Sequence, residues 1–161
     1  MLGFSLSTFT TIHVVISLIA IATGLVVTYG MLRGDRMDAW TAAFLVTTLL
    51  TSVTGFMFPF TQFLPSHAFG VISLVLLVPT LLGRYVYHLK GAWRWIYTLG
   101  AVILLYLNVF VLVVQLFLKV PTIHALAPTQ AEPPFAIAQG ITLLIFAMLA
   151  YVTARRFRPA Y

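Results

Sequence analysis

The chain has 161 residues, of which 61% are hydrophobic and only 7% charged, and its mean hydropathy is +1.06. An average soluble domain is roughly 45–50% apolar and about 25% charged, so the composition excludes a water-soluble globular fold and favours a lipid bilayer as the surrounding medium. The net charge of +6 does not indicate nucleic-acid binding, because the basic residues cluster at the ends of apolar stretches. The absence of cysteine excludes disulfides, iron–sulfur clusters and c-type haem.

Five apolar stretches are long enough to cross a membrane, which takes about 20 helical residues. The sequence therefore predicts an all-α, polytopic bundle of five transmembrane helices that forms a single domain from residue 1 to 161. No alternating apolar pattern indicates a β-barrel. In chain order the predicted spans are residues 9–32, 39–60, 67–89, 95–118 and 135–154, and residues 119–134 form the longest loop.

The basic residues predict the orientation of these spans. With five helices, the first connection, the third connection and the C-terminal tail lie on the same side of the membrane. Eight of the nine Lys and Arg residues belong to these regions, and the positive-inside rule places them in the cytoplasm. The N-terminus is then outside, the C-terminus inside, and Lys119 the only external basic residue. Arg84 lies inside an apolar run, and we expect its long side chain to reach the interface.

Two parts of the sequence resemble each other, and either a duplicated helical hairpin or chance similarity between apolar helices explains the resemblance. The segment HVVISL (13–18) resembles HAFGVISL (67–74), and MLRG (31–34) resembles HLKG (88–91). The first four spans therefore look like a duplicated hairpin, in which His13 and His67 are equivalent residues at the outer ends of two helices. In an up-down four-helix bundle such helices lie diagonally, so the two imidazoles are expected to face each other across the core.

This pair of histidines is a candidate cofactor site. Neutral imidazole binds haem iron, and two histidines from facing helices can supply both axial ligands of haem b without any cysteine. His13 and His67 are the candidate ligands, Lys119 a candidate partner for the propionates, and Gln115 and Gln139 the candidate lining of the approach. Each histidine alone is also explained as an anchor in the headgroup region.

A second arrangement uses the outer loop, residues 119–134. Its His124 and Glu132, together with His13 and His67, would provide three nitrogens and one oxygen for zinc or non-haem iron. His88 lies at the opposite, cytoplasmic end and is interpreted as an interfacial residue.

Three stretches of the chain resemble a known group of proteins: LYLNVFVLVVQLFLKVP (105–121), APTQAEPPF (127–135), and TSVTGFMFPF (51–60) with PSH (65–67). They are similar to small uncharacterised integral membrane proteins of proteobacteria, which implies the bacterial inner membrane but no activity. His13 and His67 also resemble, more weakly, the histidines of four-helix b-type cytochromes such as cytochrome b561. That family typically holds two haems, whereas the inner side here offers His88 alone, so one haem is expected.

Two functions are compatible with these features. The first is an inner-membrane protein that holds haem b or a metal ion near the periplasmic face and exchanges electrons with quinol or a partner complex. The alternative is a cofactor-free accessory or assembly subunit of a larger respiratory or photosynthetic membrane complex, which would dock through aromatic residues of the last helix such as Phe146 and Tyr151. No sequence motif identifies a catalytic reaction.

Overall fold

The computed structural model describes residues 5–58 and 65–159. This part of the chain is helical and contains no strand, which confirms the all-α prediction. The helices are α1 (Leu6–Arg33), α2 (Asp38–Gly55), α3 (Pro65–Leu81), η1 (Leu82–Val86), α4 (Ala92–Lys119), α5 (Pro121–His124) and α6 (Pro133–Arg156). The short element η1 is a π-helical continuation of α3.

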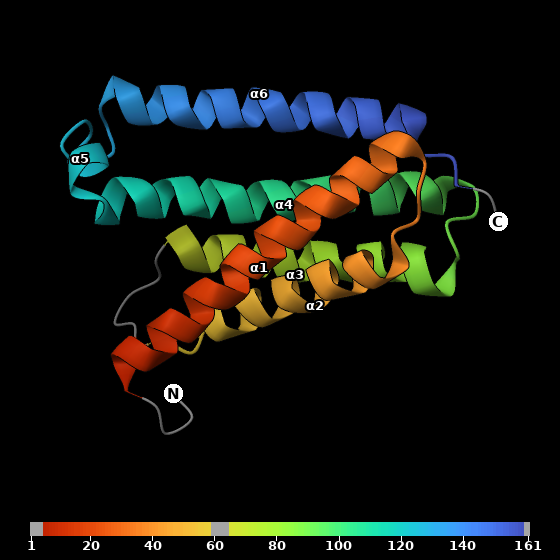
Figure 1. Ribbon diagram of the computed structural model, residues 1–161, viewed down its shortest axis with the longest axis horizontal. Coiled ribbons are helices and arrows are strands. Elements are labelled where there is room, and N and C mark those ends of the chain that lie inside the picture. Colours follow the sequence, from red (N-terminus) through yellow and green to blue (C-terminus); the bar gives the residue numbers. More distant parts are fainter. Residues whose placement is uncertain (1–4, 59–64, 160–161) are drawn as a thin grey trace.

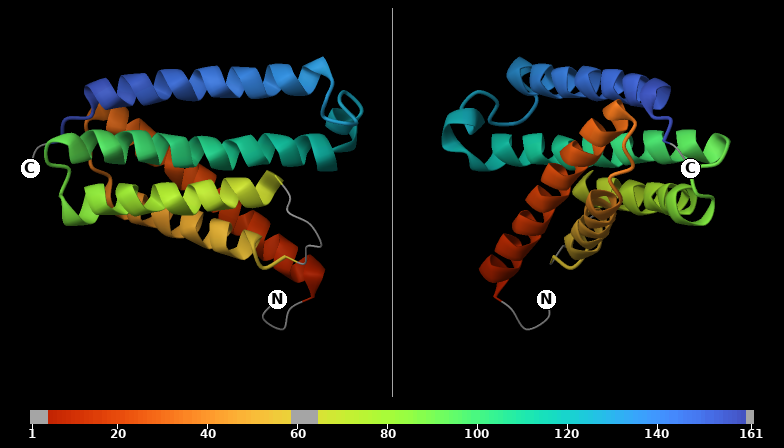
Figure 2. Two further views of the ribbon diagram at one scale, coloured as in Figure 1. Left: turned by 180° about the vertical axis from the view of Figure 1, so that it is seen from behind. Right: turned by 45° about the vertical axis from the view of Figure 1, so that its right-hand side comes forward.

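Helices α2, α3, α4 and α6 form a layer, and helix α1 crosses this layer. In the layer, α6 packs on α4, α4 on α3, and α3 on α2 (Figure 1). Helix α1 runs obliquely over this layer and contacts α2, α4 and α6, as the rear and side views also show (Figure 2). The small helix α5 lies in the connection between α4 and α6 (Figure 1).

Four of these segments are long and apolar enough to cross a membrane: α1, α3 with η1, α4 and α6. Helix α2 is not among them. It has 18 residues, which rise about 27 Å at 1.5 Å per residue, and its sequence contains five threonines, one serine and Asp38. The predicted second span continued to residue 60, whereas the helix ends at Gly55; residues 59–64 lie outside the described part.

The ends of α1 follow from local chemistry. The side chain of Ser5 accepts a hydrogen bond from the backbone N–H of Thr8, as expected for a helix-capping serine. At the other end Gly34 adopts φ 83°, a left-handed conformation that glycine reaches without steric cost. Its N–H donates to the carbonyls of Gly30 and Met31, which closes the helix before the turn to α2.

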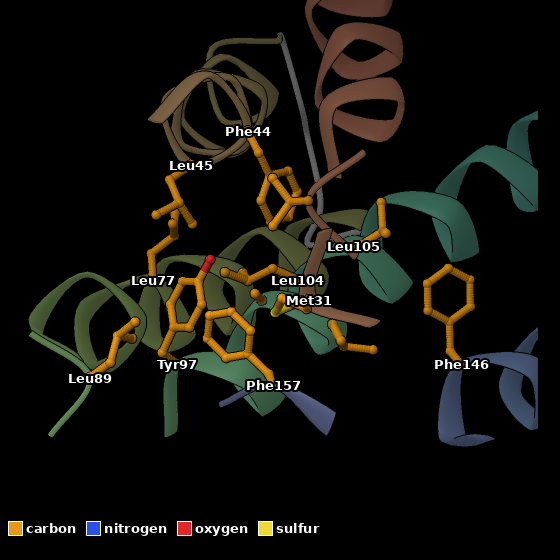
Figure 3. Packing of buried hydrophobic residues seen from close by; sticks show 13 residues of the cluster. Met31, Phe44, Leu45, Leu77, Leu89, Tyr97, Leu104, Leu105, Phe146 and Phe157 are labelled. Atoms are coloured by element: carbon orange, nitrogen blue, oxygen red, sulfur yellow. The ribbon is translucent and has the colours of Figure 1, made fainter. Parts of the chain in front are cut away.

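The buried core is formed by apolar side chains of all the long helices. Figure 3 shows Tyr97 and Leu104 of α4 beside Met31 of α1 and Phe157, which follows α6. Gly24 of α1 lies against Phe44 and Leu105, and a Cβ atom there would be only 2.7 Å from Leu105 Cδ1. Small residues that allow close helix approach are the usual means of packing helices in lipid.

The fold brings the three basic regions of the sequence to one end of the bundle. We call this the basic end; it comprises the α1–α2 turn, the α3–α4 turn and the segment after α6 (Figures 1 and 2). Arg94 of α4 connects two of these regions, since its Nη1 donates to the carbonyls of Ala154 at 3.1 Å and Phe157 at 2.6 Å. We call the opposite end, with the starts of α1 and α3 and with α5, the histidine end.

Candidate functional site

His13 is held on α2 by a hydrogen bond that determines its tautomer. Its Nδ1 lies 2.7 Å from Oγ1 of Thr54. The single hydroxyl proton of Thr54 is already donated to the carbonyl of Leu50 at 2.7 Å. The Thr54 oxygen must therefore accept from Nδ1–H of His13, and in the neutral imidazole this leaves the lone pair on Nε2.

The ring of His13 is half-buried in an aromatic environment at the end of α2. It packs edge-on against Phe58, with 5.2 Å between the ring centroids, and Phe58 packs in turn on Phe9 at 4.9 Å. Gly55 lies beside the ring: a Cβ atom at this residue would be 3.8 Å from Cε1 of His13. Among the described residues, the groups found against this ring are thus two apolar ones, Phe58 and Gly55, and the hydroxyl of Thr54.

His67 lies near the start of α3 and is buried, with 5% of its surface exposed. Its ring stacks on Phe56, with centroids 5.8 Å apart and planes inclined by 22°. Gly70 allows this approach, because a Cβ atom there would be 2.9 Å from the Phe56 ring. His13 and His67 therefore both pack on the same short segment, residues 54–58, from two different helices.

The two outer-loop candidates have other partners. Nδ1 of His124 is 2.9 Å from the carbonyl of Phe117. Glu132 accepts from the hydroxyl of Thr129 at 2.8 Å and from its N–H at 3.3 Å, and these hydrogen bonds lower the pKa of Glu132 below its usual value. Within residues 5–58 and 65–159, no three His, Asp or Glu side chains form a group that could hold a metal ion.

The remaining candidates lie on α4 and α6. Gln115 and Lys119 are exposed on the last turns of α4. Gln139 binds α6 to α4 instead, since its Nε2 donates to the carbonyl of Phe110 at 3.2 Å. The contacts of His13 within the described residues do not include these three side chains.

Arg84 has protein groups as its partners. It belongs to η1 and is buried within the protein, with 2% of its surface exposed. One Nη atom donates to the carbonyl of Arg36 at 2.9 Å and also binds the carboxylate of Asp38. The guanidinium lies over the ring of Tyr97, 5.3 Å from its centroid, so protein groups of the other helices replace the expected headgroups.

These residues form a polar cluster at the basic end, which we call the Arg84 cluster: Arg84, Asp38, Arg36, Tyr97 and Thr41. Tyr97 and Thr41 are fully buried, and their hydroxyls are 3.3 Å apart. Asp38 remains 72% exposed, and its carboxylate also lies 3.5 Å from Nε of Arg36. An arginine inside an apolar run, facing a connection that holds two of the three acidic residues, was the signal in the sequence for this cluster.

Comparison of the chain with family models, curated proteins and solved structures gives no significant match. A fold alone would in any case not define the activity, which depends on the site. The features of the chain that bear on its function are therefore the histidine end and the distribution of charge. His88, which is exposed at the basic end with φ 48°, provides a natural control for the two histidines of that site.

Proposed function

We propose that the protein is a five-span protein of the bacterial inner membrane, with its N-terminus outside, that holds one haem b near the outer end through His13 and His67. The observation that carries this proposal is the hydrogen bond that Nδ1–H of His13 donates to Thr54. The hydrogen bond to Thr54 leaves Nε2 unprotonated, which is the state that a metal requires of a histidine ligand.

The surroundings of the two histidines support the same function. Ligand histidines usually donate their second N–H to a fixed acceptor that orients the ring, and Thr54 provides such an acceptor. His67 comes from a second helix and packs on the same segment of α2 as His13. Phe56 and Phe58 supply the apolar surface that a porphyrin would contact.

A bound haem would supply one-electron chemistry, with quinol in the membrane or an outer-side protein as the partner. His13 and His67 would be the residues that hold the haem iron. Lys119 is exposed on the last turn of α4 and would interact with a propionate, and Gln115 lies one turn earlier. Zinc or non-haem iron would use the same two imidazoles, with His124 and Glu132 completing the site only after leaving their present partners.

The charge distribution supports the proposed orientation. The basic end contains the α1–α2 turn, the α3–α4 turn and the C-terminal segment, and the positive-inside rule places this end in the cytoplasm. Helix α2 connects the two ends and packs against α1 and α3. In the proposed topology it is the second span, in addition to the four helices that are long and apolar enough to cross a membrane. In this topology the duplicated hairpins correspond to α1–α2 and α3–α4.

The test is a spectrum of protein purified after expression with sufficient haem supply, together with metal analysis. We expect a haem Soret band in the wild type, its loss in His13→Ala and His67→Ala, and its retention in the matched variant His88→Ala. Zinc or iron without a Soret band would replace haem by a metal site. A protein that contains neither haem nor metal would overturn the cofactor function.

One observation favours the second candidate, a cofactor-free accessory subunit of a larger membrane complex. Only 6% of the apolar window of α6 is buried, and Leu144, Met148 and Tyr151 are each at least 60% exposed. Phe146, which the sequence placed on the docking face, is instead 7% exposed and belongs to the core. An apolar helix face left uncovered in this way is available to a partner helix. Copurification of a respiratory or photosynthetic complex with a cofactor-free protein would favour this function over the first.

A further inference from the structure

A cleft of about 430 Å³ lies between the first turns of α4 and the last turns of α6, at the basic end. Arg94 holds its two walls together by donating to the carbonyls of Ala154 and Phe157. Its guanidinium also lies over Trp95, 4.5 Å from the ring centroid. The cleft is lined by Trp95, Leu99, Ala150, Tyr151, Ala154, Arg155 and Arg158.

No Asp or Glu side chain of the chain lines this cleft or forms an ion pair with its two arginines. The whole chain has three acidic residues. Asp35 and Asp38 pair with arginines of the α1–α2 turn and with Arg84, and Glu132 precedes α6 at the histidine end. None of the ion pairs among the described residues involves Arg155 or Arg158, so their charge is available to an external anion.

The lining changes from charged to apolar along the cleft. Arg155 and Arg158 lie at and just beyond the C-terminal end of α6, nearest the basic end, whereas Ala150 and Leu99 lie about one turn further from that end along α6 and α4. Trp95 and Tyr151 lie between them, and such aromatic side chains prefer the headgroup level of a bilayer. An occupant that matches this order has an anionic group at one end and a hydrocarbon chain at the other.

We propose that this cleft binds one anionic phospholipid, with its phosphodiester on Arg155 and Arg158 and an acyl chain along Leu99 and Ala150. Basic pockets between membrane helices on the cytoplasmic side recognise anionic headgroups in this way. Trp95 and Tyr151 determine the depth of the headgroup. Arg94 fixes the spacing of α4 and α6, between which the acyl chain lies. The site lies at the opposite end from His13 and His67 and does not depend on the proposed cofactor.

The test is native mass spectrometry of the full chain released from detergent containing equal amounts of phosphatidylglycerol and phosphatidylcholine with identical acyl chains. We expect one retained phosphatidylglycerol in preference to phosphatidylcholine. Arg155→Gln and Arg158→Gln should each weaken its retention about fivefold, the effect of about 1 kcal/mol per basic residue. The matched control is Arg156→Gln, which removes the same charge from the same helix end but does not line the cleft.

Two further measurements separate this site from simple charge attraction. Ala150→Phe keeps every charge and fills the apolar part of the cleft, and we expect it also to reduce retention of phosphatidylglycerol. Inorganic phosphate should not displace the lipid, because it lacks the acyl chain. Equal losses in all three arginine variants, full retention in Ala150→Phe, or displacement by inorganic phosphate would each overturn the proposal.

Discussion

Nδ1 of His13 on α1 and Oγ1 of Thr54 on α2 lie 2.7 Å apart, and this contact joins the candidate ligand to the end of the neighbouring helix. Because the Thr54 proton goes to Leu50, the contact also decides which imidazole nitrogen carries hydrogen. The proposed chemistry and the packing of α1 on α2 therefore depend on the same hydrogen bond.

The tautomer of His13 can be measured directly. We expect ¹⁵N NMR of histidine-labelled protein without cofactor to show His13 protonated on Nδ1 and unprotonated on Nε2. Thr54→Val removes the acceptor and should produce a mixture of both tautomers, whereas Thr54→Ser should preserve the wild-type state. An Nε2–H tautomer in the wild type would contradict the hydrogen-bond assignment.

In the Arg84 cluster, removal of the carboxylate of Asp38 is expected to lower the free energy of unfolding, because the guanidinium of Arg84 stays buried. Asp38→Asn leaves the buried guanidinium of Arg84 without its carboxylate. Removing one partner of a fully buried pair costs about 3–5 kcal/mol. Because Asp38 is 72% exposed and therefore screened by solvent, we expect a smaller loss of about 2 kcal/mol in the free energy of unfolding, measured by unfolding in mixed detergent.

The controls for this prediction are present in the same turn. Asp35→Asn breaks an exposed pair with Arg33, separated by 3.8 Å, and should leave the free energy of unfolding unchanged within error, because solvent screens the pair. The double variant Asp38→Asn with Arg84→Met should recover most of the loss, because no uncompensated charge then remains buried. Additive effects of the two changes would show that Arg84 and Asp38 do not interact.

Close packing of α1 predicts a difference between two glycines. Gly24→Ala places a methyl group within 3 Å of Phe44 and Leu105, and we expect it to destabilise the protein by about 1–3 kcal/mol. Gly140→Ala on α6 meets nothing within 4 Å and should be neutral or stabilising by up to about 1 kcal/mol. Thermal unfolding in detergent compares the two, and equal effects would contradict the close approach of α1, α2 and α4.

Glu132 provides a prediction about pH, because it is the only glutamate in the chain. A single ¹³C-labelled carboxylate signal should titrate below the usual glutamate pKa, owing mainly to the hydroxyl of Thr129. Thr129→Ala should raise that pKa towards its usual value. With a folded pKa below the unfolded one, the contribution to loop stability is present above the unfolded pKa and is lost as pH falls through the folded pKa. An unchanged titration in Thr129→Ala would exclude this cause.

Composition and charge were sufficient to predict a helical membrane protein, because apolar runs about 20 residues long have few alternatives. The bounds of α1, α4 and α6 lie within three residues of the predicted spans. The second span was less predictable, because the polar side chains of α2 make its apolar character weaker. Two of its threonines donate to the backbone of the same helix: Thr47 to the carbonyl of Ala43 and Thr54 to the carbonyl of Leu50.

The candidate site was predicted only in part. The repeat identified His13 and His67, but the segment of α2 on which both rings pack could not be derived from helix spacing. In the sequence Thr54 is one of several threonines in a helix. Its role as the hydrogen-bond partner of His13 depends on the packing of α1 on α2. The burial of Arg84 likewise depends on Asp38 and Tyr97, which are 46 and 13 residues away in the chain.

The most direct test of the central claim is the visible spectrum of the purified wild-type protein, oxidised and then chemically reduced, after titration with one equivalent of haem. Joint ligation by His13 and His67 predicts a low-spin, six-coordinate b-type spectrum that saturates at one haem per chain and loses this coordination in either single alanine variant. The titration is continued beyond one equivalent so that the saturation point can be observed. A spectrum of free haem throughout, unchanged by the protein, would contradict the claim.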